Sequence, residues 1–388
     1  MRVRHLSLTN FRNYRHQELD LPEGRALVLG ANAQGKSNLL EALFLLATMR
    51  SPRAVTDVEL IHEEARETPQ PVARVAATAE RRSGDVIVDI AIVARPGAHG
   101  LLASKRVKVN GLPRRQQDAV GQINAVLCTT DDLALITGSP SERRRFLDTM
   151  LSQTDRTYAA ALSRYTRVLT QRNALLRRIQ EGLSQPDELF YWDDELAKDG
   201  ALIACARARA LEGVAARAAD AQRRLGSGER LALRYEPKFA PGWDADRLAG
   251  ASAEEARAAL RDACEASRSR DIGAGVTLTG PHRDDLAIEL MGRPAASYAS
   301  RGQQRTIALA MRLAEAERLR EETGEDPVLL LDDILSELDE ERRMTVLESV
   351  DAGQVVITSA DADRFDRTFL ASATVFVVRA GEIARRGD

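Results

Sequence analysis

The sequence predicts an α/β protein into which a helical lobe is inserted, and three observations carry this prediction. A glycine-containing loop at residues 30–37 follows the apolar run Ala26–Leu29 and precedes an amphipathic stretch. A second apolar run, Val328–Leu331, ends in two aspartates. Between these motifs, an arginine-rich segment carries apolar residues at alternating steps of four and three, the period of packed helices. Both ends of the chain are therefore expected to form one α/β domain around a helical middle.

Composition limits the classes that the chain can belong to. It has 388 residues, 44% of them hydrophobic and 29% charged, with a net charge of −3, which leaves room for two or three globular domains. No apolar run approaches the ~18 residues that span a bilayer, and the polar N-terminus does not resemble a signal peptide. Three widely spaced cysteines and five scattered histidines form no disulfide or metal pattern. A cytoplasmic protein without a membrane contact is expected.

The N-terminal part reads as short strands and one helix. Apolar alternation predicts the first strands, and the stripe from Lys36 to about Thr48 predicts the helix after the glycine loop. A β insertion is expected at about residues 70–120, where Asn110-Gly111 is a strong hairpin signal. The expected strands are Val3–Leu8, Glu18–Leu21, Ala26–Leu29, Val72–Ala79, Val86–Val93 and Arg106–Val109.

The middle of the chain predicts an antiparallel helical hairpin. Apolar residues from Tyr158 to Leu183 follow heptad steps that only Arg172 interrupts. A turn at Glu181–Leu189 separates this helix from a second one, from about Trp192 to Leu225. A Ser252/Glu255 capping box opens a further helix.

The α/β pattern returns after residue 273. Strands are expected near Val276–Thr279, Leu286–Leu290, Val328–Leu331 and Val355–Thr358, with helices from about Gly302 to Arg320 and after Asp339, and a last hairpin around Gly381. The resulting division is one α/β domain from residues 1–140 and 273–388, and an inserted helical lobe from residues 141–272.

The glycine loop has the spacing of a phosphate-binding loop. Gly30 and Gly35 are followed by Lys36-Ser37, and such glycines let backbone N–H groups and the next helix's N-terminus face phosphates. Lys36 would reach the β- and γ-phosphates, and the Ser37 hydroxyl would bind Mg²⁺. A chance glycine turn is the alternative, but the flanking strand and helix disfavour it.

The acidic strand complements this loop. Asp332 and Asp333 follow four apolar residues, at the strand end where α/β proteins bind ligands. One acid would hold Mg²⁺ and the other would polarise an attacking water. A core strand that ends in an ordinary acidic turn is the alternative.

A third motif, Ala299-Ser300-Arg301-Gly302-Gln303, is similar to the Leu-Ser-Gly-Gly-Gln signature of ATP-binding-cassette proteins. Ser300 and Gln303 also read as a plain capping box of the next helix. Both readings can hold, because a capped helix N-terminus is suited to a phosphate.

Together the motifs resemble those of the RecF family, a group of SMC-like, ATP-binding-cassette-type ATPases. The motifs are Phe11-Arg12-Asn13-Tyr14, the loop at 30–37, residues 144–148, Gln171-Arg172-Asn173, residues 279–285, Ser300–Gln303, and Asp332-Asp333 with Ser336–Asp339. The resemblance implies an ATP-binding-cassette-type phosphate-loop ATPase head with an inserted antiparallel helical-hairpin lobe. SMC proteins themselves carry far longer coiled coils.

The resemblance also implies a site. Asp333, Lys36 and Asp332 would be catalytic, and Ser37 and Asp332 would bind Mg²⁺. The expected ATP-binding residues are Arg12, Asn13, Gly30, Asn32, Gly35, Lys36, Ser37, Asn38, Ser300, Gly302 and Gln303. The chain departs from the wider cassette pattern at two places. Ser359 and Ala360 stand where a switch histidine is expected, and Thr130-Asp131-Asp132 stands where a glutamine loop is expected.

DNA contacts are expected on the lobe. Residues 141–180 carry nine arginines and three acids in a chain of net charge −3, and such a patch can follow a phosphate backbone without reading sequence. A solvated helix exterior is the alternative. The candidate DNA-binding residues are Arg143, Arg144, Arg164, Arg167 and Arg172.

The function implied by the resemblance is recombinational DNA repair. ATP held by one subunit would be capped by Ser300 of a second, so that ATP drives homodimerisation on gapped or junction DNA. Slow, DNA-stimulated hydrolysis would release the clamp, and RecR and RecO would act with it to help load RecA. Two alternatives stay open at this point: the ATPase subunit of a transporter, and a DNA-binding scaffold without productive turnover.

Overall fold

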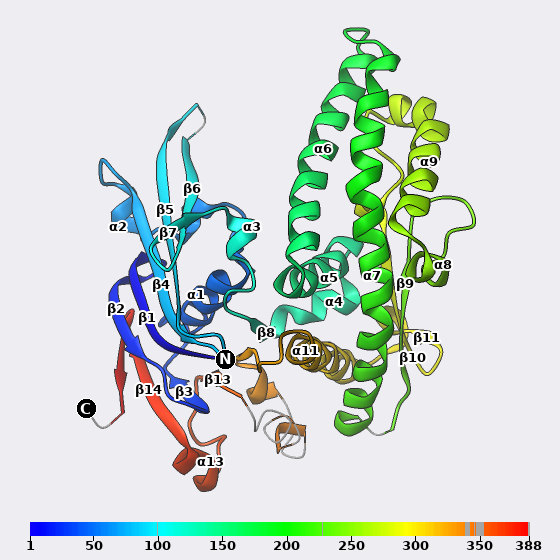
Figure 1. The fold of residues 1–388 in the computed structure, drawn as a ribbon. Coiled ribbons are helices and arrows are strands. Elements are labelled where there is room, and N and C mark those ends of the chain that lie inside the picture. The colour runs from blue at the N-terminus through cyan, green and yellow to red at the C-terminus, as the bar shows by residue number, and fades with distance from the viewer. Residues whose placement is uncertain (99, 227, 338–341, 345, 347–352, 387–388) are drawn as a thin grey trace. The chain divides into compact units, whose positions relative to one another are not determined.

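The computed structural model describes residues 1–98, 100–226, 228–337, 342–344, 346 and 353–386, and the chain divides into two compact units (Figure 1). The first unit is Met1–Asp132 with Glu315–Asp388, and the second is Leu133–Ala314. The second unit is therefore larger than the expected lobe, which was limited to residues 141–272. It also takes in residues 273–314, because their strands pair within it.

The first unit contains two sheets. Its elements are β1 (Arg2–Phe11), β2 (Tyr14–Asp20), β3 (Arg25–Leu29), α1 (Lys36–Thr48), η1 (Asp57–Leu60), α2 (Glu63–Arg66), β4 (Val72–Glu80), β5 (Val86–Gly97), β6 (Gly100–Val109), β7 (Leu112–Arg114), α3 (Gln116–Ala119), β8 (Ala125–Thr129), η2 (Thr130–Asp132), β12 (Val328–Asp332), η5 (Ile334–Glu337), β13 (Val355–Ser359), α13 (Arg367–Ser372), β14 (Ala373–Arg379) and β15 (Glu382–Arg385).

The central sheet has the order β15-β14-β3-β13-β12-β8, and its strands are parallel except for β15. Its strands β3, β12 and β13 are buried along almost their whole length, as expected for parallel strands covered on both faces. The carboxyl ends of β3, β13 and β12 consequently lie at one edge of the sheet, where α/β proteins bind ligands.

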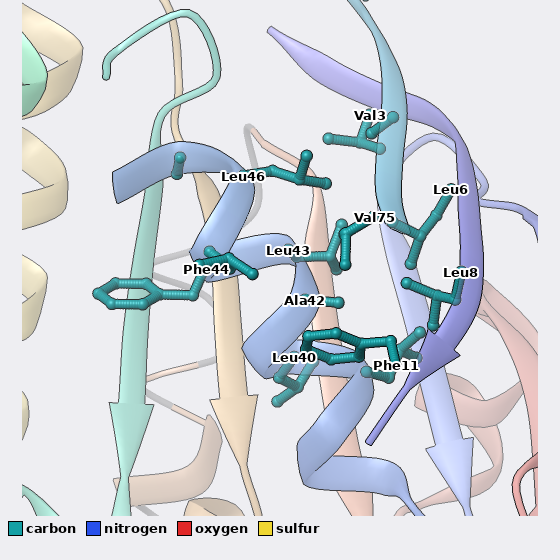
Figure 2. Packing of buried hydrophobic residues seen from close by; sticks show 14 of the residues in the cluster. Val3, Leu6, Leu8, Phe11, Leu40, Ala42, Leu43, Phe44, Leu46 and Val75 are labelled. Atoms are coloured by element: carbon teal, nitrogen blue, oxygen red, sulfur yellow. The ribbon is translucent and has the colours of Figure 1, made fainter. Parts of the chain in front are cut away.

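The second sheet is antiparallel, with the order β2-β1-β4-β5-β6-β7. The strands expected to form a separate insertion thus continue the sheet that the N-terminal strands begin. Helix α1 packs its apolar residues into the core between the sheets. Figure 2 shows Leu43 and Leu46 of α1 directed toward Leu6 and Val75 of the antiparallel sheet, while Phe44 points the other way.

The second unit is mainly helical. Its elements are α4 (Leu133–Thr137), α5 (Pro140–Thr154), α6 (Arg156–Gln180), η3 (Pro186–Glu188), α7 (Leu189–Leu225), β9 (Leu231–Glu236), α8 (Ala245–Gly250), α9 (Ala253–Ala274), η4 (Pro281–Arg283), β10 (Asp285–Leu290), β11 (Arg293–Pro294), α10 (Ala295–Tyr298) and the first part of α11 (Arg301–Thr323). The expected helix pair is present as α6 and α7, which lie side by side in Figure 1.

Three details of this unit differ from the sequence-based expectation. Helix α9 also packs against α7, so the lobe is more than a hairpin. Strands β9, β10 and β11 form their own small antiparallel sheet. The strand expected at Val276–Thr279 is absent, because Thr277 is buried in irregular backbone and hydrogen-bonded to side chains.

The helix expected after Asp339 begins outside the described residues. Within the part of the chain that the structure describes, no helix is both long enough and apolar enough to cross a bilayer.

Candidate functional site

The phosphate-type loop connects β3 to α1 and closes around its own lysine. Gly35, with φ of 119°, caps the N-terminus of α1, a backbone conformation that favours glycine. The Lys36 Nζ donates hydrogen bonds to the carbonyls of Gly30 (2.7 Å) and Ala31 (3.0 Å). Burial lowers the pKa of Lys36, and the charges of Asp333 and Asp332 act against that shift. The ammonium therefore lies inside the loop, close to both acids.

The acidic strand meets this loop at Asp332, the last residue of β12. The Ser37 hydroxyl donates to Asp332 Oδ1 at 2.9 Å. Serine and aspartate oxygens are hard ligands of the kind that Mg²⁺ prefers, and Mg²⁺ commonly takes only one or two protein ligands beside phosphates and water. Among the described residues no group of three or more His, Cys, Asp or Glu could hold a metal ion alone. The residues present thus fit a metal bound together with a nucleotide.

Thr358 completes this corner and was missed by the sequence reasoning. Its hydroxyl donates to Asp332 Oδ1 at 2.8 Å and accepts from the Asp333 backbone N–H at 3.0 Å. Asp333 itself has a φ of 54°, a conformation that is uncommon for non-glycine residues and concentrates at functional sites. A signal was available, because Thr358 is a polar residue at the end of an apolar strand and pairs with Asp332 in register.

Arg12 lies beside α1, and its guanidinium pairs with a buried carboxylate of that helix. Its Nη2 and Nε contact the two carboxylate oxygens of Glu41 at 2.7 and 2.9 Å. Burial alone would raise the pKa of Glu41, which is 1% exposed, but hydrogen bonds from Arg12 and Ser51 and the charge of Arg53 bring it below its usual value. The sequence reasoning missed Glu41 and Arg53. A contact of Arg12 with nucleotide stays a prediction.

Asn13 and Asn38 contact each other and the loop. The Asn13 Nδ2 donates to the Gln34 carbonyl and its Oδ1 accepts from Asn38 Nδ2, both at 2.8 Å. The neighbouring Tyr14 hydroxyl donates to the Gly35 carbonyl at 2.8 Å. The β1–β2 hairpin therefore contacts the loop through two consecutive residues, of which only Asn13 was expected.

The signature-like segment lies in the second unit, at the start of α11. The Ser300 hydroxyl accepts from the Gln303 backbone N–H at 3.3 Å, and the Ser300 N–H donates to Gln303 Oε1 at 2.8 Å. This is the reciprocal capping box that the sequence allowed. Ser300 and Gly302 are exposed, so the capped helix end faces solvent in the single chain. A role for these residues toward a second subunit stays a prediction.

Arg172 does not belong to a DNA-binding surface. Its side chain is 0% exposed. Its Nε pairs with the Asp193 carboxylate and its Nη1 with the Asp271 carboxylate, both at 2.8 Å. Nη1 also donates to the Thr277 hydroxyl. The expectation was wrong because Arg172 occupies a seam position of the heptad pattern, which faces α7 and α9 rather than solvent.

The other four arginines reach the surface to different degrees. Arg167 is exposed, and Arg143, Arg144 and Arg164 are half-buried. Arg143 makes a bidentate pair with Asp285 (2.7 and 3.0 Å), Arg144 donates to the Asp284 carbonyl (2.7 Å), and Arg164 pairs with Asp199 (2.6 Å). Phosphate contacts stay a prediction for all four arginines.

Several family-like motifs converge on one buried polar cluster in the second unit. The Asn173 Oδ1 accepts from the N–H and the hydroxyl of Thr277 at 2.8 and 2.7 Å. His282 Nδ1 lies 2.7 Å from the Tyr165 hydroxyl, and burial lowers the pKa of His282 to about 4. Arg207, which the sequence reasoning missed, pairs with Asp148 and Asp284 at 2.7 and 3.1 Å. These motifs are thus joined through buried hydrogen bonds and ion pairs within the second unit.

Comparison with known proteins agrees with this geometry over the whole chain. The family model for the RecF/RecN/SMC N-terminal domain matches residues 2–383. The DNA replication and repair protein RecF of Chloroflexus aggregans is 42% identical, and that of Herpetosiphon aurantiacus is 43% identical; each match covers 99% of both chains.

Solved structures give the same result. Two structures of the recombination mediator protein RecF in the RecFOR pathway, described as RecF-ATPrS and RecF-ATP, are both 31% identical, with TM-scores of 0.85 and 0.84. They cover 100% and 99% of this chain, and the chain covers 98% and 97% of theirs. The SMC head of Pyrococcus furiosus, at 17% identity and a TM-score of 0.52, shares the fold.

The expected α/β ATPase-head fold with its helical lobe is thereby confirmed. The alternative of a transporter ATPase is set aside, because whole-chain relatives are DNA repair proteins. The loop at 30–37, the acidic strand β12 and the match over residues 2–383 agree: this chain belongs to the RecF family of DNA replication and repair proteins.

Proposed function

We propose that this chain is an ATP-dependent DNA-binding protein of recombinational repair, and that ATP drives its dimerisation on DNA. One observation carries the proposal: the Ser37 hydroxyl and the Asp332 carboxylate meet at 2.9 Å next to the loop that encloses the Lys36 ammonium. This is the arrangement that a magnesium–triphosphate complex requires. The relatives named RecF-ATP and RecF-ATPrS support ATP as the nucleotide.

Each residue of the site has a distinct task in this proposal. Backbone N–H groups of Gly30, Asn32 and Gly35 and the start of α1 would face the phosphates, and Lys36 would leave its two carbonyl partners for the β- and γ-phosphates. Ser37 and Asp332 would hold Mg²⁺, which when bound neutralises developing phosphate charge. Asp333 would orient and polarise water, and Thr358 positions both acids.

Dimerisation follows from linkage between nucleotide and subunit association. ATP in one subunit would meet the exposed Ser300 and Gly302 and the half-buried Gln303 of a second, where the N-terminus of α11 attracts negative charge. ATP favours the dimer only by its differential affinity for that state. Slow hydrolysis, stimulated by DNA, would remove the γ-phosphate and release the clamp.

DNA would be held by phosphate contacts from Arg143, Arg144, Arg164 and Arg167, without base readout. Arg172 is left out because it is buried. RecR and RecO would be the protein partners at gapped or junction DNA, and the complex would help load RecA. The relatives' assignment to the RecFOR pathway supports these partners.

The decisive experiment is an ATP-turnover assay with and without duplex DNA, combined with light scattering. We expect ATP-dependent dimers and a slow turnover that DNA accelerates. The competing function is a scaffold that binds ATP without useful turnover, which Asp333 favours because a shorter acid stands where most cassette ATPases carry glutamate. Dimers with no measurable turnover under any DNA condition would favour that scaffold.

A further inference from the structure

Two hairpin turns in the first unit have nearly the same backbone but different surroundings. Asn110-Gly111 joins β6 to β7 with φ values of 50° and 78°, and Ala380-Gly381 joins β14 to β15 with 48° and 79°. Positive φ at both central residues is typical of tight hairpins. A Cβ on Gly111 would meet nothing within 4 Å, whereas a Cβ on Gly381 would lie 2.2 Å from the Asn13 carbonyl oxygen.

The β14–β15 turn donates both of its central N–H groups to one residue of the phosphate-type loop. The Ala380 N–H bonds Gln34 Oε1 at 2.6 Å, and the Gly381 N–H bonds the Gln34 carbonyl at 3.1 Å. Gln34 immediately precedes Gly35 and Lys36. The far end of the chain is thus in direct contact with the centre of the loop.

The β1–β2 hairpin contacts the same part of the loop. Asn13 Nδ2 donates to the Gln34 carbonyl, and the Tyr14 hydroxyl donates to the Gly35 carbonyl, both at 2.8 Å. A Cβ on Gly35 would lie 2.6 Å from the Asn13 side chain. Because the other amide atom of Asn13 accepts from Asn38, both polar ends of Asn13 are engaged within the protein.

The β14–β15 hairpin is itself firmly fixed. Strand β14 pairs with β3, the strand that leads into the loop. The Gln17 side chain bonds the backbone of Ile383 twice, accepting at 2.8 Å and donating at 3.2 Å. A Cβ on Gly30 would lie 2.6 Å from the Val378 carbonyl oxygen, so the loop's first glycine also packs closely on β14.

We propose that the Ala380-Gly381 turn, together with Asn13 and Tyr14, positions the phosphate loop for the nucleotide without touching it. A loop that binds phosphate through its N–H groups must turn its carbonyls away from the anion. Donors from the two hairpins bond the successive carbonyls of Gln34 and Gly35 and hold them in this orientation. This inference rests on the proposed function, because it names what pre-forms that same ATP site.

The fraction of molecules in which the phosphate loop is already in its binding conformation determines the apparent affinity for ATP. If the competent loop conformation is only fractionally populated, the apparent dissociation constant rises by the inverse of that fraction. Since the turn does not reach the reacting atoms, loss of its contacts raises Kd and KM for ATP and leaves kcat at saturating ATP unchanged. Asn13 is then a positioning residue rather than a direct nucleotide ligand.

The test compares Gly381→Ala with Gly111→Ala in the full-length chain. Both substitutions place a Cβ on a turn residue with the same positive φ, so their backbone strain is matched. Only Gly381→Ala pushes the turn away from Asn13 and Gln34. We expect ATP Kd and KM to rise about tenfold or more for Gly381→Ala, with kcat within about twofold of wild type, and no change for Gly111→Ala.

Tyr14→Phe provides an independent variant if Gly381→Ala does not fold. It removes only the hydroxyl, which burial keeps protonated by raising the pKa of Tyr14. The expected result is a several-fold rise in ATP Kd with unchanged kcat. Circular dichroism at the assay temperature verifies the fold of each variant.

Lys36→Ala distinguishes a failure of the ATP-site assignment from a failure of the positioning role alone. Full ATP affinity in Lys36→Ala would remove the ATP site itself and with it this inference. Loss of binding in Lys36→Ala, with wild-type Kd and KM in folded Gly381→Ala or Tyr14→Phe, would overturn the positioning role alone. A drop in kcat with unchanged KM would overturn it too, because the turns would then act on the chemical step.

Discussion

The Ser37 hydroxyl donates to Asp332 Oδ1 across 2.9 Å, although 295 residues separate the two along the chain. Strand β13 lies between β3 and β12 in the parallel sheet, so the carboxyl ends of all three strands reach the same edge. Two motifs from opposite ends of the sequence thereby form one oxygen-rich corner.

Lys36→Ala is expected to abolish ATP-dependent dimerisation and to leave the fold intact. The Lys36 ammonium donates to the carbonyls of Gly30 and Ala31 in this structure, and phosphates would replace them. Light scattering with and without ATP measures the effect, and thermal unfolding is the control. A variant that dimerises like wild type would contradict the phosphate-loop assignment.

Ser300→Arg should block dimerisation while ATP still binds the monomer with nearly unchanged affinity. Ser300 is exposed and its hydroxyl takes part in the capping box of α11, so a bulky cation there would obstruct a second subunit. Nucleotide titration of the dilute protein, followed by light scattering, separates the two effects. A collapse of monomer affinity would leave Ser300 without its role in the partner's site.

Asp333→Asn should keep ATP binding and remove the charge that polarises water, so that the ATP-bound dimer persists on DNA. Its backbone N–H bond to Thr358 does not depend on the side chain, and the local geometry should survive. Single-turnover hydrolysis and DNA dissociation rates are the measurements. Hydrolysis at the wild-type rate would transfer the role of base to another group, with Asp332 as the first candidate.

Arg167→Gln should weaken binding to unrelated duplexes by similar factors and flatten the plot of log affinity against log salt by about 0.9. Arg172→Gln is the matched change on the same helix, and it should instead cost about 3–5 kcal/mol of stability, because it leaves Asp271 buried without its cation and Asp193 paired with Arg268 alone. DNA titrations at three salt concentrations test the first expectation.

The fluorescence of Trp192 and Trp243 tests the stability loss that is expected for Arg172→Gln. Both tryptophans of the chain lie in the second unit, so their emission during urea unfolding follows that unit. An unchanged salt slope for folded Arg167→Gln would place the DNA footprint elsewhere. A stability loss below ~1 kcal/mol for Arg172→Gln would contradict the buried cluster.

The second unit should lose stability as the pH falls from about 6.5 to 4. Burial lowers the pKa of His282 to about 4, so His282 is protonated at a lower pH in the folded protein than in the unfolded chain. The contribution of neutral His282 to the free energy of unfolding is complete above the pKa of histidine in the unfolded chain. It is lost as the pH approaches 4, by up to about 3 kcal/mol. Urea unfolding at several pH values, followed by tryptophan emission, measures this. A His282→Gln variant with an unchanged pH dependence would exclude His282 as the cause.

The sequence identified the parts that depend on local pattern. The loop at 30–37, the apolar strand before Asp332 and the long helices α6 and α7 follow from periodicity and glycine spacing, which neighbouring residues determine. The contacts that depend on folding at a distance were not predictable. Hairpin signals predicted the turn at Gly381, but nothing local indicates that it packs on Asn13.

Charge patterns were the least reliable guide. Arg167 and Arg172 are five residues apart, about 1.4 helical turns, and looked equivalent as a basic patch, yet one is exposed and the other is fully buried. The difference lies in their faces on α6, and the heptad position of Arg172 was the available signal. Likewise, no sequence feature showed that β9 and β10 pair with each other rather than with the central sheet.

The placement of β3 in the central sheet dictates an order of events during protein synthesis. β3 leaves the ribosome early, but both of its neighbours, β13 and β14, lie beyond residue 354. At about 5–20 residues per second, β3 waits roughly a quarter of a minute to a minute for them. The second unit is continuous in sequence and emerges in full during this interval. The whole second unit is therefore synthesised while β3 still lacks both of its neighbours, and unpaired strand edges of this kind favour aggregation.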